Sequence, residues 1–202
     1  MRAELAEAAR TVLVDLKKPR ERTDQETDAL IALATFVVRA RSAVERDGYS
    51  REIELVPGAE APTRLVIVLD RLLAGLDAIG CNRSEALRVV TKAALDSVPA
   101  LRVAVLTSLR GEGQLDTNII AEAVRHPSTT TRRALEDLTA HGLVECERQG
   151  TGKPHLWSLS EFAAQRLATF PEMSSNTRSE RNKGHQGEST PSDISGKPKD
   201  AA

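Results

Sequence analysis

The feature that most restricts the fold is a change of hydrophobic period in the second half of the chain. Residues 117–124 and 128–141 carry apolar side chains at helical spacing, and a proline separates the two segments. Gly142 follows, at a position suited to the positive φ that ends a helix. Residues 143–149 and 155–160 then have the pattern of two strands joined by a Gly/Pro turn. The sequence therefore predicts two short helices followed directly by a β-hairpin.

The flanking segments extend this order at both ends. A helix reaching about Leu109 precedes the two helices, and residues 161–170 have the pattern of a closing helix. Helix, helix, turn, helix, two-stranded wing and helix is the order of a winged helix-turn-helix domain, which we place at residues 98–170. Trp157 is expected to pack the wing against the helices rather than to stack on a nucleic-acid base.

In such a domain the second helix of the turn protrudes and fits the major groove of duplex DNA. Here its first turn is rich in hydroxyl groups and arginine, which bond phosphates and base edges. A helix N-terminus also carries positive partial charge that favours a nearby phosphate. We therefore predict DNA contacts by Ser128, Thr129, Thr130, Thr131, Arg132 and Arg133 of the helix and by Arg148, Lys153 and His155 of the wing.

Net charge restricts where DNA could bind. The chain has 28 basic and 29 acidic residues, so no general attraction to nucleic acid is expected and contact has to come from a local basic surface. Glu136 and Asp137 follow the arginine pair closely and are expected to compete for Arg132 and Arg133. A winged helix that binds protein without touching DNA therefore remains an alternative.

The segment from Asn118 to Ser160 resembles the winged helix-turn-helix domains of bacterial regulators such as the MarR and ArsR families. It includes a Leu-x-x-Leu-x-x-x-Gly-Leu-Val run, from Leu135 to Val144, that is typical of a recognition helix running into its wing. The resemblance implies a winged-helix fold and binding of double-stranded DNA in transcriptional control.

Residues 1–97 are predicted to form a module of about four helices that serves in dimerisation or docking. A capping box at Thr23 and Glu26 begins a long helix that we expect to continue to Gly48. Residues 53–56 are expected to form a short strand or an extended loop. The helix of residues 63–79 is apolar on more than one face and is the expected centre of the core, with Gly80 at its C′ position. Ser84 and Ser97 are the expected N-caps of the next two helices. In the winged segment the expected N-caps are Asp116 or Thr117 for the first short helix and Ser128 for the second.

Residues 39–76 also resemble the helical lid region of actinobacterial ATPases related to replicative helicases. The resemblance implies a partner ATPase and a phosphate-sensing role for Arg64 acting in trans. The sequence has no GxxxxGK[ST] loop, so the chain would then be the detached C-terminal part of such an ATPase.

Four arginines, at positions 39, 41, 46 and 51, are interpreted as a solvated helix face paired with Glu45 and Glu52, rather than as a phosphate-binding patch. Residues 171–202 are rich in Ser, Gly, Lys and Pro, and we expect this tail to be disordered.

Several classes of function have no support in the sequence. Cys81 and Cys146 are too few for a disulfide framework and fit a reducing compartment. A zinc set of Cys146 with the histidines 126, 141 and 155 matches no common ligand spacing, and no catalytic arrangement is apparent. No signal peptide and no apolar run long enough to cross a bilayer is present. We therefore expect a cytoplasmic protein that is not an enzyme, has no cofactor or metal and does not contact a membrane.

Overall fold

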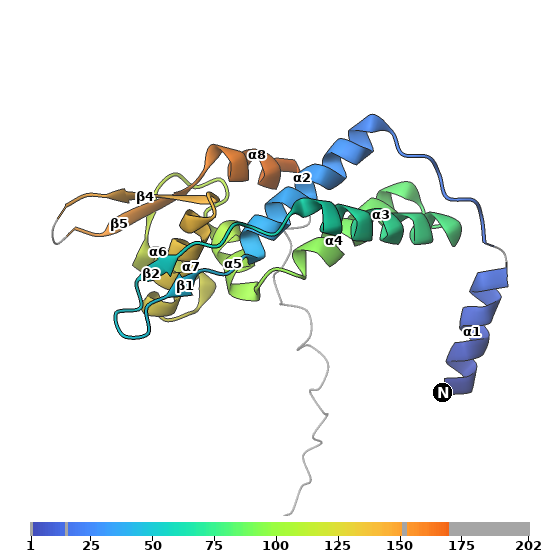
Figure 1. The fold of residues 1–202 in the computed structure, drawn as a ribbon, viewed down its shortest axis with the longest axis horizontal. Coiled ribbons are helices and arrows are strands. Elements are labelled where there is room, and N and C mark those ends of the chain that lie inside the picture. The colour runs from blue at the N-terminus through green and yellow to red at the C-terminus, as the bar shows by residue number, and fades with distance from the viewer. Residues whose placement is uncertain (1, 15, 151–152, 170–202) are drawn as a thin grey trace, which may run out of the picture.

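The computed structural model describes residues 2–14, 16–150 and 153–169. The chain is mainly helical, and its strands form two small antiparallel sheets (Figure 1). The helices are α1 (Arg2–Val14), α2 (Asp24–Arg41), α3 (Pro62–Ala78), α4 (Arg83–Leu95), α5 (Ala100–Ser108), α6 (Thr117–Val124), α7 (Ser128–Ala140) and α8 (Glu161–Thr169). The strands are β1 (Glu45–Arg46), β2 (Ile53–Leu55), β3 (Leu115–Asp116), β4 (Val144–Arg148) and β5 (His155–Leu159). The tail predicted for residues 171–202 lies outside the described residues.

The winged helix-turn-helix order is confirmed. Helices α5, α6 and α7 are followed by the antiparallel β4–β5 wing and by α8 (Figure 1). Strand β3 adds a third member that the sequence analysis missed, so the sheet order is β3-β5-β4. Trp157 is buried on β5, and its indole N–H donates to the Thr117 hydroxyl at 2.9 Å. The predicted packing role of Trp157 is therefore confirmed.

Some helix ends follow the predicted capping signals. Thr23 and Glu26 form the expected capping box at the start of α2. The Asp116 carboxylate accepts from the first N–H groups of α6. Gly80 and Gly142 adopt the predicted left-handed φ of 78° and 71° just after α3 and α7. These signals are local, because donor and acceptor lie within a few residues of each other.

The three serines predicted as caps do not cap. Asn82 caps α4, and prolines hold the N-cap positions of α5 and α7. Pro127 has a φ of −55°, close to the helical value, so the helix begins immediately after it and Ser128 lies inside the first turn. The corrected positions are Asn82 for Ser84, Pro99 for Ser97 and Pro127 for Ser128.

The long helix predicted to reach Gly48 ends earlier, at Arg41. Ser42 takes an extended conformation with ψ at 139°, and its hydroxyl donates to the Val38 carbonyl at 2.6 Å. The chain then forms the β1–β2 hairpin, which confirms the strand alternative for residues 53–55. The hairpin bonds replace the last helical turns of the prediction.

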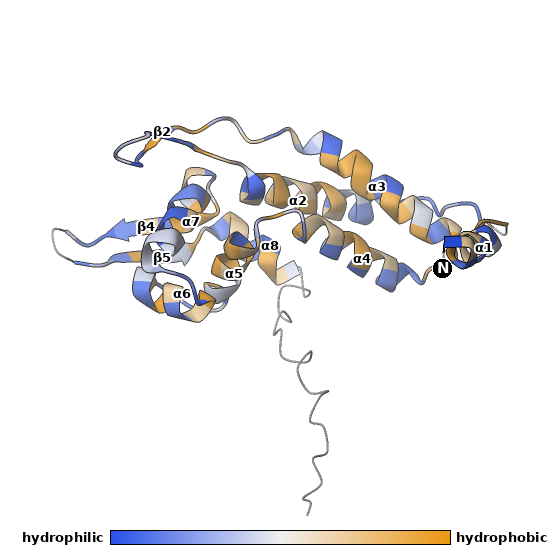
Figure 2. Cartoon of the chain, turned by 90° about the horizontal axis from the view of Figure 1, so that it is seen from below, coloured by the Kyte–Doolittle hydropathy of each residue, from blue (hydrophilic) through white to orange (hydrophobic). Residues whose placement is uncertain are grey.

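Helix α2, rather than α3, lies at the centre of the core. Helix α3 buries a single stripe, Leu65, Leu69 and Leu73, and leaves Ile67 and Val68 exposed, although Figure 2 shows apolar residues over much of its visible face. The buried residues of α2 lie on more than one side of that helix: Leu30, Leu33, Ala34, Phe36, Val37, Val38 and Ala40. The prediction that α3 is the central element is therefore wrong.

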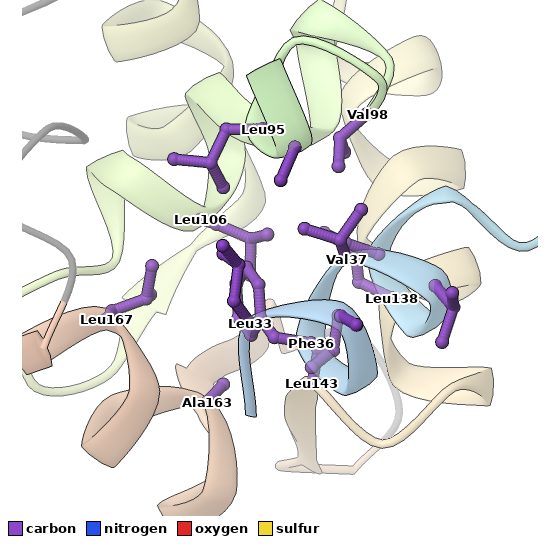
Figure 3. Packing of buried hydrophobic residues seen from close by; sticks show 14 of the residues in the cluster. Leu33, Phe36, Val37, Leu95, Val98, Leu106, Leu138, Leu143, Ala163 and Leu167 are labelled. Atoms are coloured by element: carbon purple, nitrogen blue, oxygen red, sulfur yellow. The ribbon is translucent and has the colours of Figure 1, made fainter. Parts of the chain in front are cut away.

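The buried residues of both halves of the chain form one cluster. Figure 3 shows Phe36 of α2 among Leu106 of α5, Leu143 beside the wing, and Ala163 and Leu167 of α8. Helix α2 accordingly contacts α5 and α8 as well as α3 and α4. The helical N-terminal half therefore packs directly on the winged segment, while the division of the chain at residue 97 remains a prediction.

A network of ion pairs joins the segment before α2 to α3 and α4. The Asp77 carboxylate, with no exposed side-chain surface, accepts from Arg22 at 2.8 Å and from Arg83 at 2.7 Å. Burial alone would raise the pKa of Asp77, but hydrogen bonds from these two guanidinium groups outweigh it and lower that pKa. The Arg83 hydrogen bond likewise lowers the pKa of Glu26 to about 2. These carboxylates are therefore charged in the folded protein.

Among the described residues, no helix is long and apolar enough to cross a membrane.

Candidate nucleic-acid interface

The first turns of α7 present most of their predicted contact residues to solvent. Ser128, Thr129, Thr130, Arg132 and Arg133 are all exposed. Pro127 at the N-cap has no side-chain acceptor, so no capping side chain occupies the N–H groups at the start of α7. Exposed hydroxyls and guanidinium groups thus lie near helix N–H groups that no capping side chain holds.

Thr131 differs from its neighbours, because its side chain points into the protein. Its exposed fraction is 0%, and its hydroxyl has no hydrogen-bond partner among the described residues. A side chain with no exposed surface offers no atom to a DNA duplex. We therefore leave Thr131 out of the interface proposed below, which retains the other eight predicted residues.

Replacing Thr131 with valine is expected to stabilise the protein. Valine has nearly the same shape, and the substitution removes a buried hydroxyl that has lost its bonds to water, so we expect the free energy of unfolding to rise by about 1 kcal/mol. Urea titration followed by circular dichroism measures the change. The matched control is Thr130→Val on the exposed side of α7, with an expected change within about 0.5 kcal/mol. A destabilised Thr131→Val variant would contradict the assignment.

The acidic pair of α7 is occupied by arginines from elsewhere in the chain. Arg46 of β1 bonds Glu136 at 2.9 Å and Asp137 at 2.5 Å, and Arg102 of α5 bonds Asp137 at 2.8 Å. Glu136 keeps a longer contact of 3.5 Å with Arg132. The expected competition for Arg132 and Arg133 is therefore weak, and among the described residues no ion pair holds Arg133.

Arg46 is held tightly in this position. Burial of Arg46 opposes its charge, but hydrogen bonds to Asp137 and Glu136 outweigh it and raise the pKa of the guanidinium. The same group donates to the Arg51 carbonyl at 2.9 Å and to the Arg133 carbonyl at 3.2 Å. The interpretation of Arg46 as part of a solvated helix face is wrong, because the helix has ended before it.

The other members of that arginine group also have separate environments. Arg39 lies over the Phe162 ring at 4.6 Å, and Arg41 bonds Glu60 at 2.5 Å. Arg51 is exposed on the β1–β2 turn with a positive φ of 63°. The four arginines therefore form neither a helix face nor one phosphate patch.

The wing carries the remaining three predicted residues. Arg148 and His155 are paired across β4 and β5, and they are exposed, as is Lys153. The His155 ring stacks on Trp157 with centroids 6.0 Å apart, and its Nδ1 lies 3.5 Å from the Cys146 sulfur. Burial raises the pKa of the Cys146 thiol, which favours the neutral thiol.

Two exposed residues between α6 and α7 were missed in the sequence analysis. Arg125 adopts a left-handed φ of 56° where α6 ends, and His126 follows it. Both immediately precede the exposed first turn of α7. Their place in the turn of a helix-turn-helix was the available signal, but His126 had been considered only as part of a zinc set and Arg125 had not been singled out.

The histidines and cysteines do not gather into a metal site. Within residues 2–14, 16–150 and 153–169, no group of three or more His, Cys, Asp or Glu residues is arranged to hold an ion. His141 is buried and its Nε2 lies 3.2 Å from the Ala43 carbonyl. Arg64, assigned a phosphate-sensing role by resemblance, is exposed in the first turn of α3.

No protein-family model matches the chain, and no curated protein matches its sequence. Among solved structures, the chain is similar to the disulfide-formed AbfR, at 21% identity and a TM-score of 0.37, over 56% of this chain and 75% of that one. It is also similar to the homodimeric winged helix-turn-helix DNA-binding domain of Mb0332 from Mycobacterium bovis, a possible ArsR-family transcriptional regulator. That similarity has 19% identity and a TM-score of 0.33, over 64% of this chain and 98% of that one. TM-scores this low do not establish a shared fold, so the winged-helix assignment rests on this chain's own elements.

Proposed function

We propose that this protein binds double-stranded DNA through its winged helix-turn-helix unit and acts in transcriptional control. In this proposal the first turns of α7 enter the major groove and the wing contacts the phosphate backbone. The proposed contacts are Ser128, Thr129, Thr130, Arg132, Arg133, Arg148, Lys153 and His155, joined by Arg125 and His126 from the turn before α7.

The observation that carries the proposal is that Glu136 and Asp137 on α7 form ion pairs with Arg46 and Arg102. Considered alone, α7 has two arginines and two carboxylates and no net charge. Arg46 and Arg102 add two positive charges next to Glu136 and Asp137. The charges of the acidic pair are therefore met by Arg46 and Arg102, whose side chains are 15% and 11% exposed, and this leaves the exposed Arg132 and Arg133 to contact phosphates although the whole chain is nearly neutral.

The direct test is binding of the full chain to fluorescent, mixed-sequence genomic duplex at low salt, measured by fluorescence anisotropy. We expect salt-sensitive binding, because phosphate contacts release counterions. The double variant Arg132→Ala/Arg133→Ala is expected to lose roughly 30-fold or more in affinity, since each arginine at a groove contributes about 1–3 kcal/mol.

The matched control is Arg64→Ala/Arg71→Ala, which removes two exposed arginines from α3 and the same net charge. It should bind DNA within about twofold of the unmodified protein, since a charge change far from the interface is screened. No binding to genomic duplex at low salt would overturn the proposal and favour the alternatives, an adaptor without DNA contact or a fragment of a helicase-like ATPase.

The proposal includes self-association through the N-terminal helices. The exposed apolar side chains of Ile67 and Val68 on α3, and of Leu55 and Val56 just before it, offer a surface for such contact. The stoichiometry of the same DNA titration reports whether one or two copies bind each duplex.

A further inference from the structure

The β1–β2 hairpin of the N-terminal half lies beside α7. Figures 1 and 2 show this hairpin and strands β4 and β5 at the same end of the molecule, with α7 between them in both views. The chain thus carries two projecting hairpins, one on each side of the helix proposed to enter the major groove. The β1–β2 hairpin lies outside the predicted winged segment, residues 98–170.

Arg46 fixes this placement. Its guanidinium joins the hairpin to α7. It donates to the Arg51 carbonyl in its own turn, and on α7 to the Arg133 carbonyl and to the carboxylates of Glu136 and Asp137. The side chain is largely buried by these contacts, with 15% of its surface exposed. A buried arginine with carboxylate partners is costly to displace, so the hairpin is held against α7 rather than free to swing.

The turn itself is built by Asp47. Its carboxylate accepts from the N–H groups of Tyr49 at 2.9 Å and Ser50 at 2.6 Å, and its own N–H donates to the Glu52 carbonyl. The backbone hydrogen bonds from Ser50 and Tyr49 lower the pKa of Asp47 and so stabilise its carboxylate within the turn. These hydrogen bonds close the turn at the tip of the hairpin, residues 48–51.

The tip has the chemistry of a backbone-contacting element. Tyr49, the chain's one tyrosine, is 99% exposed, and Ser50 and Arg51 beside it are exposed as well. Among the described residues, no ion pair holds the Arg51 guanidinium. The glutamates of the hairpin lie below its tip: Glu45 and Glu54 are on the strands, and the Glu52 carbonyl accepts from the Asp47 N–H where the turn closes. The Ser50 hydroxyl accepts from the Glu52 N–H at 3.3 Å within the turn, so the phenol of Tyr49 and the guanidinium of Arg51 are the exposed groups at the tip that can bond phosphate oxygens.

We propose that the β1–β2 hairpin is a second DNA-contacting element, which uses Tyr49 and Arg51 on the phosphate backbone beside the groove occupied by α7. This inference rests on the proposed function, because the hairpin is continuous with the α7 surface. Arg46 is its positioning residue and does not touch DNA. The two hairpins then hold the duplex on both sides of α7.

The test uses the full chain in the same anisotropy titration. Tyr49→Ala/Arg51→Ala is expected to weaken binding about threefold to tenfold and to reduce the slope of log affinity against log salt by about one, as expected for one lost phosphate contact. Because both side chains are exposed, the melting temperature should not change. Arg71→Ala, an exposed arginine on α3, is the matched control and should leave affinity and slope unchanged.

A second measurement detects the contact directly. With p-benzoylphenylalanine in place of Tyr49, ultraviolet light should crosslink the protein to bound duplex, whereas the same group in place of the exposed Ala93 on α4 should not. Unchanged affinity of the tip variant and no crosslink from position 49, while Arg132→Ala/Arg133→Ala loses binding, would overturn the hairpin proposal alone. Absence of any DNA binding by the unmodified chain would instead remove the proposed function on which it rests.

Discussion

Replacing Phe36 with alanine is expected to destabilise the protein by about 4 kcal/mol, the typical cost of deleting a fully buried aromatic ring and leaving a cavity. Phe36 has an exposed fraction of 0% and lies where α2 meets α5, α8 and the start of the wing (Figure 3). The cavity would therefore open in the contact between the N-terminal helices and the winged segment. For a chain of this length the melting temperature should fall by roughly 10 °C.

Two probes of unfolding make this result specific. Trp157, the chain's one tryptophan, reports the winged segment by fluorescence, and circular dichroism at 222 nm reports all helices. Both signals should shift to the same lower denaturant midpoint, because the buried residues form one cluster. Ile31→Ala on the same helix is the control: Ile31 is 45% exposed and its loss should cost less than about 1 kcal/mol. A Trp157 transition that stays at its original midpoint would contradict a shared core.

Asp77→Ala should have the next largest effect, a loss of about 3 kcal/mol in the free energy of unfolding. The Asp77 carboxylate has no exposed surface and bonds both Arg22 and Arg83, whose side chains are themselves largely buried. Removing one partner of a buried ion pair leaves uncompensated charge in a poorly solvated place. Urea titration at neutral pH, where the carboxylate is charged, measures the loss.

The neighbouring Asp70 provides the control for that experiment. It also bonds Arg22 at 2.8 Å, but its side chain is 47% exposed. Exposed ion pairs contribute little, so Asp70→Ala should cost less than about 1 kcal/mol. Equal effects of the two substitutions would show that burial of Asp77 does not decide the stability of this network.

Local patterns were sufficient for the architecture of the second half of the chain. The period change after α7, the Gly142 stop and the Asp116 cap each act over a few residues, and each appears in the structure. The exposed face of α7 was also predictable, because helical spacing separates Arg132 and Arg133 from the buried Leu135 and Leu138.

Other features depended on residues far apart in sequence. The end of α2 at Arg41 depended on the pairing of β1 with β2, and here strand pairing outweighed local helical preference. Thr131 is a different case, because helical spacing places it on the same face as the buried Ala134, Leu135 and Leu138, and the sequence analysis missed this signal by treating its hydroxyl as a DNA contact.

The winged helix-turn-helix order and its exposed arginine turn were thus readable from amino-acid pattern, because hydrophobic period and turn residues act within one element. The electrostatic character of α7 could not be predicted from the sequence, because the partners of Glu136 and Asp137 are Arg46, about ninety residues earlier, and Arg102 of α5. Only the folded chain brings those charges together, because an ion pair depends on distance in space and not in sequence. Whether α7 is neutral or positive, and therefore how well it suits DNA, was decided by the packing of the β1–β2 hairpin and α5 against it.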